Sequence, residues 1–493
     1  MNQEIPDNYK DLKVKHEALM GDYLELSSRV ERLEELLRSA HASRFSFKSE
    51  HLTHPGMLPL FPEEGEEEKD EPKEREVRGH TRTITKKPIP EHLPRVDVHL
   101  DVPDHEKTCS SCSEAMSEFK KDISEKLHIK PAELLVKRFI RPAYKCNKCD
   151  ELRQSKMPVH PIPKAGITVE TLAHIAISKY LGGLPLYRQE KIFERSGIQL
   201  GRDKMSKWMI RLGEKLDPLK NLLHQELIED GFLGMDETHF QVLKEENRRP
   251  DAKSYMIIQA REGPPGKNIS VFHYETSRSK EVVARHLNGF EGSVVTDGLM
   301  TYLSYFQSKD EISHGGCWAH GRRRFVEAVK ARKSKKGVAK DVLQLIKQLF
   351  KIESRIKGKP DEEILEVRTR ESAPLIAEIE ELWVANLESI PKKSLTGEGL
   401  HYLRNQWDCL TRFLKDPKLP LSNNYVEQKV RPFATGRKSW LFADTVEGAN
   451  ASAVLYSLLV TAKDNGLNPY AYLSKVFTEI DSTEDLRQLL PFS

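Results

Sequence analysis

The chain has 493 residues, more than one hydrophobic core usually organises, so the sequence predicts several domains. Hydrophobic residues make up 38% of it and charged residues 31%, a polar composition that leaves room for linkers and exposed helices. The formal net charge of +3 neither favours nor excludes nucleic acid as a partner, so the distribution of charge has to decide. Because no run of about 18 apolar residues and no apolar stretch after a basic start occur, we expect a cytoplasmic protein without a signal peptide or membrane span.

Leucines recur every seven residues near the N-terminus, at Leu12, Leu19, Leu26 and Leu33. Heptad spacing among charged residues predicts a leucine-zipper-like coiled coil over residues 1–47, and with it a homodimer. An amphipathic helix packed on its own protein is the alternative. Residues 48–97 hold an acidic run and then a basic, proline-rich segment, neither of which can bury a core, so we expect a low-complexity linker there.

Two Cys-x-x-Cys pairs follow within residues 98–155, Cys109 with Cys112 and Cys146 with Cys149. In a protein without an export signal, paired cysteines favour metal binding over disulfides. Four thiolates can close the tetrahedral shell of one Zn²⁺ ion. The sequence therefore predicts a zinc-binding domain with a structural ion, and a redox-active thiol pair is the other interpretation.

Residues 156–229 have a helical pattern with a break at Gly182 and Gly183 and a turn at Gly197. The two helices on either side of Gly197 predict a helix-turn-helix-like DNA-binding domain. Binding in the major groove is the functional interpretation, and an ordinary helical hairpin is the alternative. Three basic residues are expected on the exposed side of the second helix: Arg202, Lys204 and Lys207.

From residue 230 the pattern changes to strands, and residues 230–320 are expected to form the first part of a catalytic core. Three strands, a helix over 279–290 and a fourth strand are the order that opens an RNase H-like domain. Asp236 lies within the first strand and Asp297 at the end of the fourth, and in that topology the two strands are neighbours. Two carboxylates held close together repel unless a cation neutralises them, so the pair predicts a divalent metal site. The strands are expected over 232–244, 252–261, 269–275, 292–298 and 312–318.

A third carboxylate is expected from a later helix, which Asn424 would cap. Glu427 then shares a polar helix face with Gln428 and Arg431. Asn-x-x-Glu is also close to a capping box, a purely structural device. Placed after the two aspartate-bearing strands, Glu427 is interpreted as the third metal ligand. Two Mg²⁺ ions about 4 Å apart suit such oxygen ligands, and they can activate water and stabilise the leaving oxygen of a phosphodiester.

Residues 321–412 predict a helical insertion between the second and third carboxylates, followed by the second part of the core with a C-terminal element at 413–475 and a tail at 476–493. Basic residues and one aromatic residue cluster near the predicted centre. They would suit contacts with DNA phosphates and a splayed base, although a solvated face is the alternative. Cys317 and His320 suggest another metal, but a structural role is more common at this spacing. The clustered residues are Arg322, Arg323, Arg324, Arg431, Arg437, Lys438 and Trp440.

At this point the motifs resemble those of the transposase of the insertion sequence 66 family, which belongs to bacterial mobile elements. The resemblance covers nearly the whole chain, with the motifs in the family's order. Two positions depart from the family's pattern: Ser46 replaces a usual Gly, and Gln428 replaces the usual Arg after the Glu. The matching segments are the leucine heptads with SRFSFKSEHL, the pairs CSSC and CNKC, KYLGGLPLYRQEKIFERSGIQLGRDKMSKW, MDETHFQVL, VVTDGLMTY, GCWAHGRRRF, LSNNYVEQKVRPFATGRKSWLFA and TAKDNGLNPYAYL.

The resemblance implies a DDE-type transposase whose Asp236, Asp297 and Glu427 hold Mg²⁺ or Mn²⁺. It also implies double-stranded DNA as the partner, both the terminal inverted repeats and the target, and accessory proteins of the same element. The expected architecture is a multidomain α+β and α-helical protein. An RNase H-like catalytic domain with a helical insertion follows a coiled coil, a zinc-binding module and a helix-turn-helix-like domain. Two alternatives stay open, a DNA-binding regulator without catalytic activity and another RNase H-like nuclease.

Overall fold

The computed structural model describes residues 16, 19–20, 96–97, 114, 134–145, 147, 150–331 and 337–492. The chain divides into two compact units, one of residues Phe61–Ser155 and the other of Met1–Leu60 with Lys156–Ser493. In the first unit, the described residues include a short antiparallel hairpin of β1 (Ala143–Lys145) and β2 (Leu152–Gln154). The predicted coiled coil and linker lie almost entirely outside the described residues, and the four cysteines predicted to bind zinc all lie outside them.

A five-stranded sheet forms the centre of the second unit, in the order β6-β5-β3-β7-β8. Strands β3 (Phe232–Phe240), β5 (Ser254–Arg261) and β6 (Ile269–Glu275) are antiparallel neighbours. Strand β7 (Gly292–Val295) then pairs with β3 in parallel, and β8 (Ile312–Gly315) pairs with β7 in parallel. The five expected strands are therefore present, and the first and fourth are neighbours as predicted.

The change from antiparallel to parallel pairing follows from the connections between the strands. Antiparallel neighbours can be joined by short loops, whereas a parallel neighbour needs a crossover, which usually contains a helix. Helix α5 (Lys280–His286) provides the crossover before β7, and α6 (Met300–Phe306) provides the one before β8. A small separate parallel pair joins β4 (Val242–Lys244) to β9 (Ala443–Thr445).

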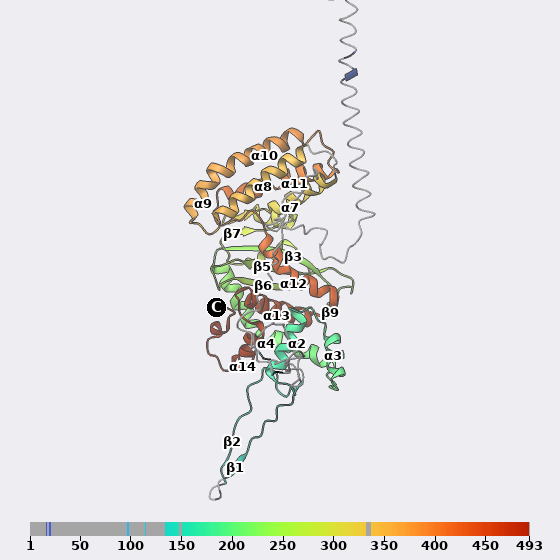
Figure 1. Cartoon of the computed structure of the whole chain (residues 1–493), viewed down its shortest axis with the longest axis vertical. Coiled ribbons are helices and arrows are strands. Elements are labelled where there is room, and N and C mark those ends of the chain that lie inside the picture. The colour runs from blue at the N-terminus through green and yellow to red at the C-terminus, as the bar shows by residue number, and fades with distance from the viewer. Residues whose placement is uncertain are drawn as a thin grey trace, which may run out of the picture. The chain divides into compact units, whose positions relative to one another are not determined.

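Helix α13 (Val446–Asp464) lies along the edge strand β6, as Figure 1 shows. The backbone N–H of Phe272 donates to Ser457 Oγ at 2.8 Å, and that of Ser270 donates to Thr461 Oγ1 at 3.1 Å. The Thr461 hydroxyl in turn donates to the carbonyl oxygen of Ser270. Two hydroxyl residues of α13 therefore satisfy the outward backbone groups of Ser270 and Phe272 on the edge strand.

Helices α2 (Val169–Tyr180), α3 (Leu186–Arg195) and α4 (Arg202–Glu229) share one buried core with the sheet and α13. The turn between α3 and α4 contains Gly197 at φ +76°, a conformation that suits glycine. The helix, glycine turn and helix predicted from the sequence are thus present. Helix α14 (Pro469–Glu479) packs against α2.

A second buried core belongs to the helices that connect β8 with α12 (Asn424–Trp440), and Figure 1 shows these helices gathered beyond β7. Arg368, in a short π-helical turn, is buried and binds Glu353 as well as the carbonyl oxygens of Phe413, Asp416 and Leu419. Of the described helices, none is long and apolar enough to span a membrane. The connecting helices are α7 (Trp318–Ala331), α8 (Val338–Ile356), α9 (Asp361–Val367), α10 (Ala373–Asn386) and α11 (Leu395–Thr411).

Candidate active site

Asp236 and Asp297 lie at the same level of two adjacent strands. In the parallel pairing of β3 with β7, Gly234 is opposite Val295. Asp236 comes two residues after Gly234, and Asp297 two residues after Val295, just beyond the end of β7. Parallel strands in register carry equivalent positions side by side, so the sheet brings together the two aspartates predicted from the sequence.

The carboxylate of Asp236 lies in an environment that opposes its charge. Burial, followed by the charge of Asp297, raises the pKa of Asp236 well above its ordinary value, and Glu237 and Glu427 add to the effect. Among the described residues, no Lys or Arg forms an ion pair with either aspartate. A bound cation would relieve this repulsion, so the pair has the chemistry of a divalent metal site.

Glu237 is a further carboxylate at this centre, and the sequence analysis did not single it out. Arg278 Nη1 donates to Glu237 Oε1 at 2.7 Å, and the Tyr302 hydroxyl donates to Oε2 at 2.8 Å. Burial and the charge of Asp297 raise the pKa of Glu237. Both carboxylate oxygens thus already have partners, so Glu237 anchors Arg278 and α6 beside the aspartates. No local sequence signal could have found this contact, because its partners are 41 and 65 residues away.

Helix α12 docks on β3 directly beside Asp236. The side-chain amide of Asn423 donates to the carbonyl oxygen of Met235 at 2.6 Å. Gly234 makes the approach possible, because a Cβ there would lie 2.4 Å from Val426 Cγ2 and 2.7 Å from Asn423 Oδ1. Glu427 follows Asn423 by one helical turn, and its charge is one of those that raise the pKa of Asp236.

The predicted cap of this helix is wrong. Asn424 is the first helical residue, the N-cap position belongs to Asn423, and no side chain caps the helix. The side-chain amide of Asn423 instead donates to the carbonyl oxygen of Met235 in β3, so a tertiary contact replaces the local cap. Among the described residues, Glu427 Oε1 is buried without a hydrogen-bond partner, so the capping-box alternative for Glu427 is wrong as well.

Two residues of helix α7 and the residue that precedes it lie around Glu427. His320 Nδ1 lies 3.7 Å from Glu427 Oε1, and Arg323 Nη2 lies 3.9 Å from Oε2. Cys317 is fully buried, and its Sγ accepts a hydrogen bond from the backbone N–H of Asn423 at 3.3 Å. Of the predicted basic residues, Arg323 thus contacts the candidate site directly.

The other predicted contacts on α7 and α12 lie in different environments. Arg322 is half-buried, and burial lowers its pKa. Arg437 is also half-buried and donates to Thr238 Oγ1 at 2.9 Å, which ties the end of α12 to β3. Arg431 and Lys438 are exposed, as binding to a phosphate requires. Arg324 is exposed and pairs with Glu398 at 3.0 Å.

Trp440 and the basic residues of α4 complete the predicted set. Trp440 packs edge-to-face on Phe240 and Phe433, with ring centroids 5.5 and 5.4 Å apart, so its ring stabilises the contact between α12 and the sheet. Arg202, Lys204 and Lys207 are all exposed in the first two turns of α4. Among the described contacts, none joins these three residues to the carboxylates.

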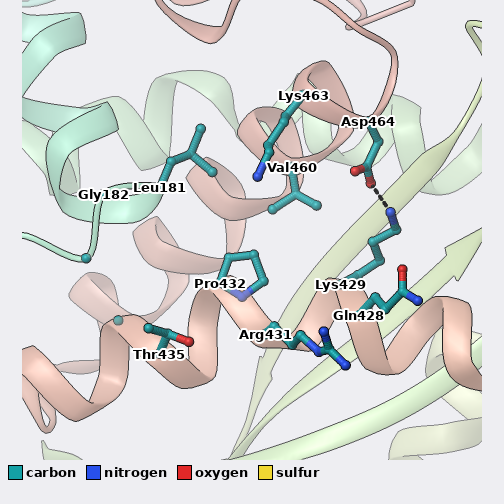
Figure 2. A pocket seen from close by; sticks show the side chains of 12 residues that line it. Leu181, Gly182, Gln428, Lys429, Arg431, Pro432, Thr435, Val460, Lys463 and Asp464 are labelled. Carbon is teal, nitrogen blue, oxygen red and sulfur yellow. Dashed lines mark ion pairs between the residues drawn. The ribbon is translucent and has the colours of Figure 1, made fainter. Parts of the chain in front are cut away.

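A cavity of about 440 Å³ lies beside α12, where the loop of Gly182 and Gly183 approaches it. Figure 2 shows Arg431 and Pro432 below this cavity and Lys463 pointing into it from α13. Lys429 pairs with Asp464 at 2.8 Å across one end. Neither Asp236 nor Asp297 lines the cavity.

The protein is thus a mixed helix-and-sheet protein whose central strands bring several carboxylates together. Residues 164–451 match the family described as Transposase IS66 family. The chain belongs to this family. Three further matches cover other parts of it: residues 32–98 match "Transposase C of IS166 homeodomain", residues 106–150 match the "zinc-finger binding domain of transposase IS66", and residues 457–492 match the "IS66 C-terminal element".

Similar proteins occur in Sinorhizobium fredii (strain NBRC 101917 / NGR234). The uncharacterized protein y4qI is 31% identical over 415 residues, which cover 82% of this chain and 76% of the relative. The uncharacterized protein y4jD is 29% identical over 508 residues and covers 98% of both chains. The likeness to y4jD therefore extends beyond residues 164–451 to nearly the full length.

Proposed function

We propose that the chain is a DNA transposase that cleaves and joins DNA strands at an Asp-Asp-Glu site in an RNase H-like domain. The observation that supports this proposal most is the register of β3 and β7, which brings Asp236 and Asp297 side by side. The hydrogen bond from Asn423 to Met235 holds the start of α12, and with it Glu427, next to them. The sheet order, with three antiparallel strands followed by two parallel ones, supports the RNase H-like assignment.

In this proposal, Asp236, Asp297 and Glu427 hold one or two Mg²⁺ or Mn²⁺ ions. The charge repulsion at Asp236, to which Asp297 and Glu427 both contribute, fits cation binding. The bound ions would supply an activated water and stabilise the leaving oxygen. The chain's own residues fix the geometry of the site. Gly234 and Asn423 set the distance of α12 from the strand. Arg278 and Tyr302 donate hydrogen bonds to the two carboxylate oxygens of Glu237.

Other parts of the chain are assigned by the same proposal. The 106–150 match supports a structural Zn²⁺ held by Cys109, Cys112, Cys146 and Cys149. Exposed basic residues on α4 and α12 are proposed to bind the DNA backbone, where arginine and lysine supply most of the affinity. The substrates are the element's terminal inverted repeats and a target DNA. A homodimer formed through residues 1–47 would hold two DNA ends together, with accessory proteins of the same element as further partners.

The test is Mg²⁺-dependent cleavage and strand transfer on DNA that carries the element's own ends. The parent should give joined products, whereas Asp236→Asn should bind DNA but give neither cleavage nor joining. Asp251→Asn, which removes an exposed carboxylate that pairs with Arg249, should behave like the parent. Binding without cleavage by the parent, even with Mn²⁺ and accessory proteins, would indicate a DNA-binding regulator. Cleavage without joining would indicate a plain nuclease.

A further inference from the structure

Cys317, His320 and Glu427 form a group whose ligand atoms all lie within 4.8 Å of one another. Cys317 directly precedes α7 and His320 lies in its first turn, while Glu427 lies in the first turn of α12. Two ligands three residues apart in sequence, joined by a third from a distant segment, are a common way to build a metal site in proteins.

The spacing of the atoms fits a shared metal ion better than a direct contact. His320 Nδ1 and Glu427 Oε1 are 3.7 Å apart, which is beyond the ~3.2 Å limit of a good hydrogen bond. Two ligands that each bind a tetrahedral Zn²⁺ ion at about 2.1 Å are separated by about 3.4 Å. Both atoms are buried, and among the described residues neither has a hydrogen-bond partner. Such buried polar atoms generally have a partner, so something is expected between them.

The ligand set distinguishes this group from the two aspartates. A thiolate, an imidazole and a carboxylate favour Zn²⁺ and similar transition metals, whereas Asp236 and Asp297 offer only the oxygen ligands that Mg²⁺ prefers. Arg323 contacts the other oxygen of Glu427, Oε2, which leaves Oε1 directed toward His320.

We propose that Cys317, His320 and Glu427 bind one transition-metal ion of the Zn²⁺ type, at a site distinct from the Asp236–Asp297 pair. The ion would fasten the start of α7 to the start of α12. Three protein ligands leave one tetrahedral position open for water or a phosphate oxygen. The proposal shares Glu427 with the proposed transposase centre, but metal binding can be measured without DNA and without catalysis.

Cobalt binding to the full chain tests this site, because a Co²⁺–thiolate bond gives a near-ultraviolet absorption band. The protein is first given one equivalent of Zn²⁺, which the four-cysteine module should take, since Zn²⁺ binds more tightly than Co²⁺. Titration with Co²⁺ should then show one further equivalent with a thiolate band in the parent. Cys317→Ser should lose the band, and His320→Gln should weaken Co²⁺ binding by at least about tenfold.

Cys409→Ser is the matched control, because Cys409 is a free, half-buried thiol 3.4 Å from His314 and outside the proposed site. It should keep the band. If Cys317→Ser does not fold, as judged by circular dichroism, the half-buried His320→Gln decides. No further Co²⁺ equivalent in the parent, an unchanged band in Cys317→Ser, or an unchanged Co²⁺ affinity in His320→Gln would overturn the proposal. Asp236→Asn should lose DNA cleavage and still bind this Co²⁺, so the two proposals can fail separately.

Discussion

Gly234 determines how closely helix α12 approaches strand β3. Val426 and Asn423 occupy the space that a side chain at this position would need. Glu427 belongs to the same helical turn as Val426, so the position of the third carboxylate depends on a residue that takes no part in chemistry. The absence of a Cβ at Gly234 thus links the packing of the core to the position of Glu427 in the candidate site.

Gly234→Ala should therefore displace α12 and impair both stability and DNA cleavage. Overpacking of this kind usually costs about 1–3 kcal/mol, which urea-induced unfolding would detect. Gly448→Ala is the control, since the nearest atom to its added Cβ would be Thr445 Oγ1 at an ordinary 3.6 Å. Equal stability of the parent and the Gly234 variant would show that α12 can shift without cost.

Asp236 should lower the stability of the metal-free protein at neutral pH. Its pKa is raised in the fold, so its contribution to stability is largest below the ordinary value of 3.8 and is lost as the pH rises through the raised pKa. Asp236→Asn should therefore unfold at a higher urea concentration than the parent at pH 7 without divalent metal. Adding Mg²⁺ should stabilise the parent more than the variant. A variant that is less stable than the parent under metal-free conditions would contradict this account.

Two sets of buried or half-buried polar side chains connect neighbouring elements, and each makes the stability of the fold sensitive to a different change. Arg368 joins α8 to the loop before α12 through Glu353 and three carbonyl oxygens. His224 of α4, His273 of β6 and His286 of α5 pack against one another, with ring centroids between 4.1 and 6.4 Å apart. In both cases the contact holds elements together that are distant in sequence.

Arg368→Ala should destabilise the chain by about 3–5 kcal/mol, because it leaves Glu353 and several carbonyl groups without their buried partner. Chemical unfolding measures the change. Arg370→Ala, which removes an exposed arginine paired with Glu366 and Glu371, should have little effect. Similar losses in the two variants would argue against a structural role specific to Arg368.

The histidine cluster should make stability fall in mild acid. Burial lowers the pKa of His224 and, more strongly, that of His273, and nearby Lys220 adds to both shifts. A lowered pKa means that the neutral form is favoured in the fold, so stability is present above about pH 6.5 and is lost as the pH falls below it. Each group contributes a slope of up to about 1.4 kcal/mol per pH unit. Urea unfolding between pH 7.5 and 5.5 should show a shallower slope for His273→Gln, and an unchanged slope would exclude the cluster as its cause.

At the scale of the whole molecule, the strands, the glycine turn and the two aspartates were predictable because each has a local pattern. Apolar runs indicate the strands, and Asp236 and Asp297 converge once the strand order is known. The hydrogen bond of Asn423 to Met235 was not predictable, because it joins residues 188 positions apart. That same contact made the predicted cap at Asn424 wrong. The packing role of Trp440 was missed for the same reason, since Phe240 lies far away in sequence.

The division into two compact units predicts that residues 156–493 fold on their own. The sheet, α4 and α13 share one buried core within this region, so removing the preceding residues should leave that core intact. Limited proteolysis should cut near Ser155 and leave a resistant fragment. The isolated fragment should melt cooperatively by circular dichroism, and a fragment without a cooperative transition would show that the preceding residues are needed for folding.

The hydroxyl groups of Ser457 and Thr461 have one more consequence, which concerns how copies of the protein behave when crowded together. An uncovered outer strand is a template on which another chain can add a strand, and such growth leads to aggregation. Here α13 already occupies the outward N–H groups of Ser270 and Phe272. Copies of the protein can therefore meet at high local concentration without this edge of the sheet recruiting them into fibres.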